Sequence, residues 1–179
     1  MKTFSVNLLV LSLALLFLGC DKAQLEPMAE GSAAVDLRSN NGATQISGIG
    51  FYAAAAECDY PAEGADFALK LTGDLEGCLF AYVDDFDCSP SGTYRESGRE
   101  YFVGTYKGEF GTFWTTYKFE AKFEGCSEDG FFSGAEIFGR CQHPLQEGSG
   151  TGVFEGVRGR LDFKDDIEAG NFPYRGHFK

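Results

Sequence analysis

Apolar and polar residues alternate along much of the second half of the chain. Between Phe113 and Phe123 the odd positions are mostly apolar, whereas the even positions include Lys118, Glu120 and Lys122. A period of two is typical of a strand that buries one face. The pattern therefore predicts a half-buried strand over residues 113–123.

Seven further segments carry strand signals. Residues 67–71 and 160–164 repeat the alternation, and other aromatic runs are bounded by Gly, Ser, Pro or Asp. These runs are residues 45–52, 79–83, 100–106, 135–138 and 174–178. No segment has the apolar spacing of a helix of any length.

The sequence predicts an all-β fold, a single antiparallel eight-stranded barrel. Glycine-containing turns at residues 106–111 and 126–130 join consecutive strands, as in a meander. Closing eight strands on themselves removes the exposed edges of an open sheet. A two-sheet β-sandwich is the alternative. A membrane-spanning barrel is excluded because the outward positions carry Lys, Glu and Asp.

The start of the chain has the features of an export signal. Lys2 precedes an apolar run over residues 8–18 that is too short to cross a bilayer comfortably. The run ends at Gly19-Cys20, which resembles the lipobox of bacterial lipoproteins, where the cysteine thiol carries diacylglycerol. An ordinary signal peptide is the alternative.

The predicted export signal and the predicted barrel divide the chain into three parts. We expect a signal peptide of lipoprotein type over residues 1–19, a flexible tether over residues 20–44 and the barrel over residues 45–179. Lipid on Cys20 would then anchor the protein to a membrane of the bacterial cell envelope. The outer-membrane, periplasmic and cell-surface sides all remain open.

Charge restricts the partners further. The 179 residues include 27 Asp and Glu against 15 Lys and Arg, a formal charge of −12. Binding to a nucleic-acid backbone needs a basic surface, so a nucleic-acid partner is excluded. The oligomeric state is left open.

Five cysteines follow Cys20. They are Cys58, Cys78, Cys88, Cys126 and Cys141. In an exported protein they predict two disulfides and one free thiol, and their spacing does not decide the connectivity. A zinc site at Cys126, Cys141 and His143 is the rival, but no C-x-x-C pair accompanies it. We therefore expect no metal and no cofactor.

Glycines recur in a pattern near the end of the chain. The sequence of residues 150–163 is GTGVFEGVRGRLDF, with the key positions Gly150, Gly152, Phe154, Gly156 and Gly159. This GxGxFxGxxGxxxF pattern resembles the late-strand signature of the allene oxide cyclase and dirigent-like barrels. The glycines would permit bends at a barrel corner, and Phe154 would fill the space beneath them.

The resemblance implies a small barrel with a hydrophobic cavity. One branch of these barrels cyclises an epoxide of a fatty acid, and another steers the coupling of phenoxy radicals. The fold alone transfers neither chemistry. No motif here matches the polar catalytic groups of the cyclases, so the resemblance assigns no active residue.

The side chains inside the barrel decide between the function classes. The candidate cavity-lining residues are Phe67, Leu69, Phe113, Tyr117, Phe119 and Phe163. An eight-stranded barrel is wide enough to be filled by such rings or to hold one small ligand, and we favour the filled interior. A buried Tyr117 would need a partner for its hydroxyl.

The pattern assigns almost only Phe, Leu, Val or Thr to inward positions, so we assign no catalytic residue. His143 and His177 are expected in loops or at strand ends. A non-catalytic role is therefore favoured, either binding of a small apolar ligand or a surface interaction. The alternative is a cyclase or isomerase that acts inside the barrel. A cavity above about 300 Å³ with a tyrosine and a carboxylate, such as Glu120 or Glu155 turned inward, would overturn the preference for a non-catalytic role.

Overall fold

The computed structural model describes residues 42–54, 57–58 and 63–179, which contain nine strands. The strands are β1 (Thr44–Tyr52), β2 (Phe67–Gly73), β3 (Leu75–Cys88), β4 (Thr93–Tyr106), β5 (Glu109–Cys126), β6 (Phe132–Pro144), β7 (Thr151–Gly152), β8 (Gly159–Lys164) and β9 (Phe172–Phe178). Each of the eight predicted segments lies within one of them, and β7 is the addition. No helix in the described part of the chain is long and apolar enough to cross a membrane. The predicted signal peptide, Cys20 and the predicted tether up to residue 41 lie outside the described residues.

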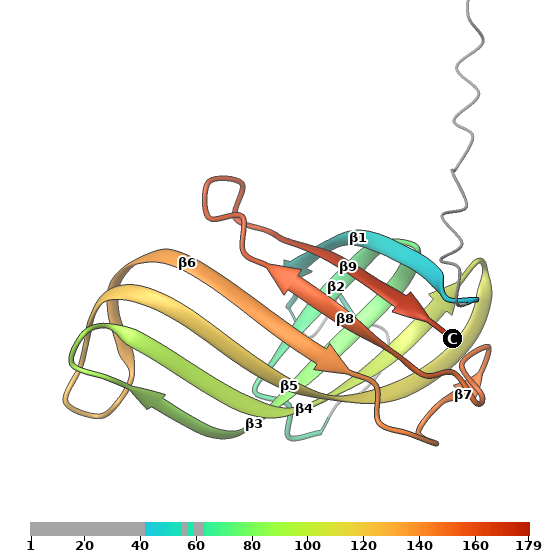
Figure 1. Ribbon diagram of the computed structural model, residues 1–179, viewed down its shortest axis with the longest axis horizontal. Coiled ribbons are helices and arrows are strands. Elements are labelled where there is room, and N and C mark those ends of the chain that lie inside the picture. The colour runs from blue at the N-terminus through green and yellow to red at the C-terminus, as the bar shows by residue number, and fades with distance from the viewer. Residues whose placement is uncertain (1–41, 55–56, 59–62) are drawn as a thin grey trace, which may run out of the picture. The chain divides into compact units, whose positions relative to one another are not determined.

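Eight of the strands form a closed antiparallel barrel (Figure 1). Each pairs with its neighbour in chain order, with β8 following β6. The ring closes where β9 pairs with β1, from Phe178 opposite Thr44 to Phe172 opposite Gly50. Strand β7 lies outside the ring and pairs with two residues of β5. The predicted eight-stranded barrel is confirmed, and the sandwich alternative is wrong.

The connection between β4 and β5 is a two-residue turn, inside the predicted segment 106–111. Tyr106 lies opposite Glu109, and the two residues between them, Lys107 and Gly108, have φ angles of 54° and 80°. Two successive positive φ angles match the right-handed twist of the flanking strands. This turn therefore fixes the register of the two longest neighbouring strands.

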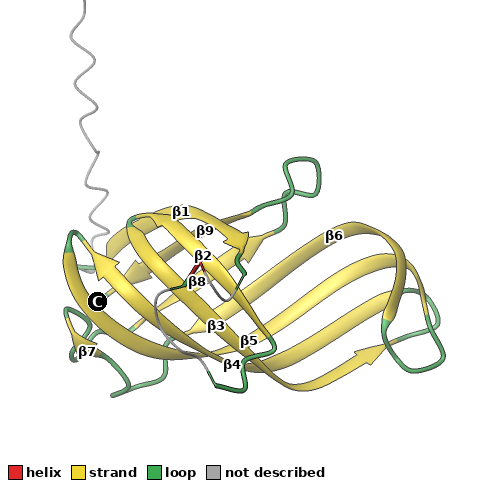
Figure 2. Ribbon diagram, turned by 180° about the vertical axis from the view of Figure 1, so that it is seen from behind, coloured by secondary structure: helices red, strands yellow, loops and turns green. Residues whose placement is uncertain are grey.

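The strands differ in length, and this difference shapes the site. Strands β3, β4, β5 and β6 contain 14, 14, 18 and 13 residues, whereas β1, β2, β8 and β9 contain 9, 7, 6 and 7. Figures 1 and 2 show the four long strands continuing together beyond the shorter ones. One end of the barrel is thus bounded by a wall of long strands.

A plug of aromatic rings closes the opposite end. The Phe113 ring lies 4.8 Å from the rings of both Phe102 and Phe154, and Phe154 is fully buried. Gly152, two residues before Phe154, has a φ of 59°. Phe154 and Phe113 both belong to the plug.

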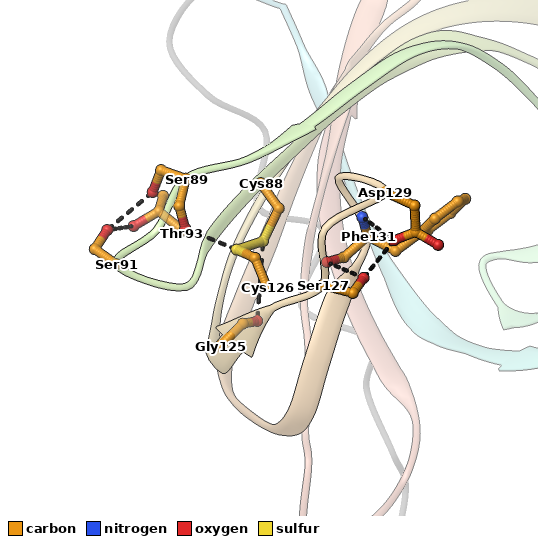
Figure 3. Close-up of a disulfide and its surroundings, with 9 residues drawn as sticks. All are labelled: Cys88, Ser89, Ser91, Thr93, Gly125, Cys126, Ser127, Asp129 and Phe131. Atoms are coloured by element: carbon orange, nitrogen blue, oxygen red, sulfur yellow. Dashed lines mark hydrogen bonds between the residues drawn. A yellow bond between two sulfur atoms is a disulfide. The ribbon is translucent and has the colours of Figure 1, made fainter.

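The two disulfides are Cys58–Cys78, which ties the connection between β1 and β2 to β3, and Cys88–Cys126, which ties β3 to β5. Cys78 lies on the outer face of β3, in a small cluster with Phe80 and Val103. The Cys88–Cys126 bridge joins the far ends of β3 and β5, beside the turn that begins at Ser89 (Figure 3). Cys141 is a buried free thiol. The prediction of two disulfides and one free thiol is confirmed.

Removing the bridge between β3 and β5 tests its role. The double variant Cys88→Ser, Cys126→Ser should lose about 2 to 4 kcal/mol of unfolding free energy, because the bridge closes a loop of 38 residues in the unfolded chain. Urea unfolding measures the loss. The control is Ser91→Ala in the neighbouring turn, which keeps the bridge. A double variant within 1 kcal/mol of the unmodified protein would contradict the prediction.

Candidate functional site

A cavity of about 360 Å³ lies inside the barrel at the end bounded by the long strands. Ten aromatic rings line it, and they come from strands on all sides of the barrel and from Phe131, just before β6. At its rim the Tyr52 ring contacts the Phe172 ring at 4.8 Å, and the Phe123 and Phe132 rings stack at 4.0 Å. The preference for a filled interior is therefore wrong, because the rings fill one end and only line the other.

Five of the six candidate lining residues surround this cavity. They are Phe67, Leu69, Tyr117, Phe119 and Phe163. The sixth, Phe113, lies in the plug that forms the closed end. The alternation alone did not show which inward residues line the cavity and which belong to the plug, since every second residue of β5 points inward along its whole length.

Glu96, on β4, is held by two phenols. The hydroxyls of Tyr94 and Tyr117 donate to its Oε2 and Oε1 atoms, each at 2.7 Å. Burial, followed by the hydrogen bond to Glu96, raises the pKa of both phenols. The tyrosines therefore remain neutral donors. The buried Tyr117 hydroxyl was expected to need a partner, and that partner is Glu96.

Glu100 and His143 form a second polar group at the base of the cavity. Both side chains are 3% exposed, and Glu100 Oε2 lies 2.5 Å from His143 Nδ1. The same oxygen accepts a hydrogen bond of 2.7 Å from the Thr115 hydroxyl. His143 Nε2 is buried and has no hydrogen-bond partner among the described residues. The imidazole lies between the rings of Tyr117 and Phe163, at 6.1 and 4.6 Å.

Two carboxyl groups, Glu136 and Asp165, face each other at the rim. Burial and then the hydrogen bond with Glu136 raise the pKa of Asp165 to about 7. The same pair adds to the effect of burial in raising the pKa of the Tyr52 phenol. Gly139 lies against both carboxyls, and a Cβ atom there would collide with them. The glycine thus leaves the space that the pair occupies.

The free thiol of Cys141 also lines the cavity. Burial raises its pKa, and the nearby Glu100 carboxylate raises it further. Neutral thiols are poor nucleophiles, so Cys141 acts in this site as a small apolar wall residue. Within the described residues, no group of three or more His, Cys, Asp or Glu side chains is arranged to hold a metal ion.

The expectation of an almost entirely apolar interior is wrong. Glu96 was missed because β4 begins at Thr93, seven residues before the segment that the pattern predicted. Glu100 is the first residue of that segment and faces inward on the same side of the strand as Phe102. His143 lies near the end of β6, as expected, but its side chain points into the interior. The polar stretch RESGRE over residues 95–100 carries the signal that was missed, since its two acidic residues lie two and six positions before the inward Phe102 of the same strand.

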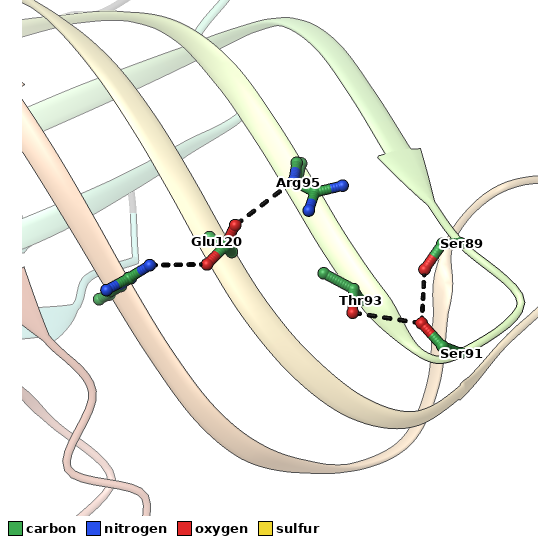
Figure 4. A network of polar contacts seen from close by, with 6 residues as sticks. Ser89, Ser91, Thr93, Arg95 and Glu120 are labelled. Atoms are coloured by element: carbon green, nitrogen blue, oxygen red, sulfur yellow. Dashed lines mark hydrogen bonds and ion pairs between the residues drawn. The ribbon is translucent and has the colours of Figure 1, made fainter.

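The two carboxylates named as inward candidates lie elsewhere. Glu120 is on the outer face of β5, between the guanidinium groups of Arg95 at 3.3 Å and Arg140 at 2.8 Å (Figure 4). The hydrogen bond from Arg140, opposed by partial burial, lowers the pKa of Glu120. Glu155 is exposed in the turn after β7. His177 lies on β9, between the buried inward residues Gly176 and Phe178, so it faces outward.

The carboxyl pair predicts a pH dependence of stability. The pKa of Asp165 is 3.8 in an unperturbed chain and about 7 in the folded protein, so between these values the folded state holds a proton that the unfolded state has lost. Stability should therefore fall as the pH rises from 4 to 7 and should then level off.

The Asp165→Asn variant should lack this loss. Its unfolding free energy, relative to that of the unmodified protein, should rise between pH 4.5 and pH 8 in urea unfolding. The control is Glu168→Gln, which removes an exposed carboxylate from the same loop. A difference between Asp165→Asn and the unmodified protein that stays constant with pH would contradict the prediction.

Comparison with known proteins adds no relative to this geometry. No protein-family model matches the chain, and no curated protein matches it. The function has to be argued from the residues of the cavity.

Proposed function

We propose that the protein is a lipid-anchored protein of the bacterial cell envelope whose barrel binds a small apolar ligand. The anchor is proposed from the sequence, in which Cys20 follows an apolar run and precedes the first described strand by more than twenty residues. Ligand binding is proposed from the interior of the barrel.

The observation that carries the binding proposal is the aromatic cavity. Its volume of about 360 Å³ falls in the range of small-molecule sites, and its walls are mostly apolar with a few fixed polar groups. An empty apolar cavity of this size would forfeit the dispersion contacts that a ligand supplies. The polar groups at its base and rim would orient the ligand.

A neutral apolar dye such as Nile red tests the binding. Its fluorescence should increase on addition of the protein, and Phe119→Ala should weaken binding about tenfold, because a ring of the wall is lost. Phe51→Ala removes an exposed ring from strand β1 and is the matched control. Equal affinity of the two variants would place the dye outside the cavity.

Changing Cys20 tests the anchor. In bacterial cells the Cys20→Ala variant should move from the membrane fraction to the soluble fraction, because it has no thiol to carry lipid. Immunoblotting of the two fractions measures the change. A variant that stays wholly in the membrane pellet would contradict lipid attachment.

A second candidate function is proton transfer in the cavity, as in an isomerase or a cyclase. The observation that favours it is the Glu100–His143 pair, whose Nε2 atom is buried beside the cavity with no protein partner. Glu100 would orient the imidazole, and Nε2 would remove a proton from one carbon of an apolar substrate and return it to another. The tyrosine and carboxylate in the same cavity satisfy the criterion set above for this alternative.

Isomerisation of 3-cyclohexen-1-one to its conjugated isomer, followed by absorbance, tests this candidate. The unmodified protein should accelerate the reaction, and His143→Gln should reduce the rate at least 100-fold. His177→Gln, on the outer face of β9, should leave the rate unchanged. Full activity of His143→Gln would exclude this imidazole as the base.

A further inference from the structure

Most of the ionisable side chains around the cavity are acidic. Four acidic side chains line it, namely Glu96, Glu100, Glu136 and Asp165. His143 is the single basic side chain among the described lining residues, and it is already paired with Glu100. Even if a positive charge on His143 cancels that of Glu100 and one proton is shared between Glu136 and Asp165, the cavity keeps an excess of negative charge. A charge enclosed by apolar walls favours a ligand of opposite charge.

The hydrogen-bond donors of the interior are used within the protein. The phenols of Tyr94 and Tyr117 donate to Glu96, and the hydroxyl of Thr115 donates to Glu100. Among the described lining residues, the hydroxyl of Tyr52 at the exposed rim and the weakly donating thiol of Cys141 are the donors left over. A ligand that reaches the base of the cavity therefore meets few donors.

The polar atoms that remain open are acceptors. His143 Nε2 and Glu136 Oε1 are both buried, and neither has a hydrogen-bond partner among the described residues. In the neutral imidazole whose Nδ1 donates to the Glu100 carboxylate, Nε2 carries a lone pair. A buried acceptor without a donor costs about 1 to 3 kcal/mol. A ligand with N–H donors would remove this cost.

The walls suit the same ligand. The faces of aromatic rings attract cations, and the ten rings around the cavity provide such faces beside the carboxylates. The chain as a whole carries a formal charge of −12, which raises the local concentration of cations. We infer that the ligand is an organic cation, an apolar body that carries an amine or ammonium group directed to the acidic side chains of the cavity.

This inference rests on the proposed binding function and names its ligand class. Neutral and anionic ligands of the same shape provide the comparison. The first would leave the open acceptors without donors, and the second would be repelled by the carboxylates. The preference for a cation over its neutral analogue is therefore the quantity to measure.

Three matched probes measure this preference: 4-phenylbutylamine, 4-phenylbutanol and 4-phenylbutanoate. Displacement of Nile red from the full chain at pH 7.5 gives each affinity. The amine should bind at least tenfold more tightly than the alcohol, and the carboxylate should bind more weakly than either. Glu96→Gln and Glu136→Gln should each reduce the preference for the amine over the alcohol at least threefold.

Glu120→Gln is the matched control. It removes one negative charge from the outer face of β5, where Arg95 and Arg140 flank it, and should leave the preference for the amine unchanged. Should Glu96→Gln fail to fold, Asp165→Asn removes a carboxyl from the same cavity and replaces it in the test.

The outcomes separate the two proposals. Equal affinities for the amine and the alcohol, or tighter binding of the carboxylate, would overturn the cation and keep apolar binding. An unchanged preference in every cavity variant would also overturn it. Failure of all three probes and of the dye would overturn the binding function itself.

Discussion

The pairing of the first strand with the last closes the structure, and the other features depend on it. Strands β1 and β9 pair over seven residues, so no strand of the ring presents an unpaired edge along this seam. Closure also gives every strand an inside and an outside. Once the ring is complete, each residue along a strand faces either the interior or the solvent, and the interior becomes a space of limited size.

The unequal lengths of the strands divide this interior into two levels. At the closed end, the rings of Phe102, Phe113, Phe154 and Phe178 contact one another and exclude solvent. Above them the long strands β3 to β6 continue past the short ones, so one wall is taller than the opposite wall. The cavity lies at this end, lined by side chains of the long strands and of the short strands β1, β2, β8 and β9.

Polar side chains are stable inside this apolar cavity because they form hydrogen bonds with one another. Each oxygen of Glu96 accepts from a tyrosine, and Glu100 accepts from Thr115 and His143. These contacts offset the loss of water around the carboxylates. After these contacts are made, the cavity still has unpaired acceptor atoms and an excess of negative charge. These two features are the basis of the proposed ligand class. The same His143 Nε2 atom is the basis of the second candidate, since a lone pair that accepts a hydrogen bond can also accept a proton.

The local pattern of the sequence determined the eight strands, their antiparallel order and the glycine turns, because alternation and turn chemistry depend on residues close in the chain. The number of disulfides followed from the count of cysteines. It did not determine which acids face inward. Continuing the period of two from Phe138 and Arg140 would put Glu136 on the outer face, but an irregularity in the register around Ile137 turns it inward opposite Phe123. The pairing of the cysteines and the open cavity likewise depend on strand lengths and registers, which are set by hydrogen bonds to neighbouring strands. Only the tertiary structure decides these, because a side chain's direction in a barrel depends on the strand beside it as well as on its own sequence.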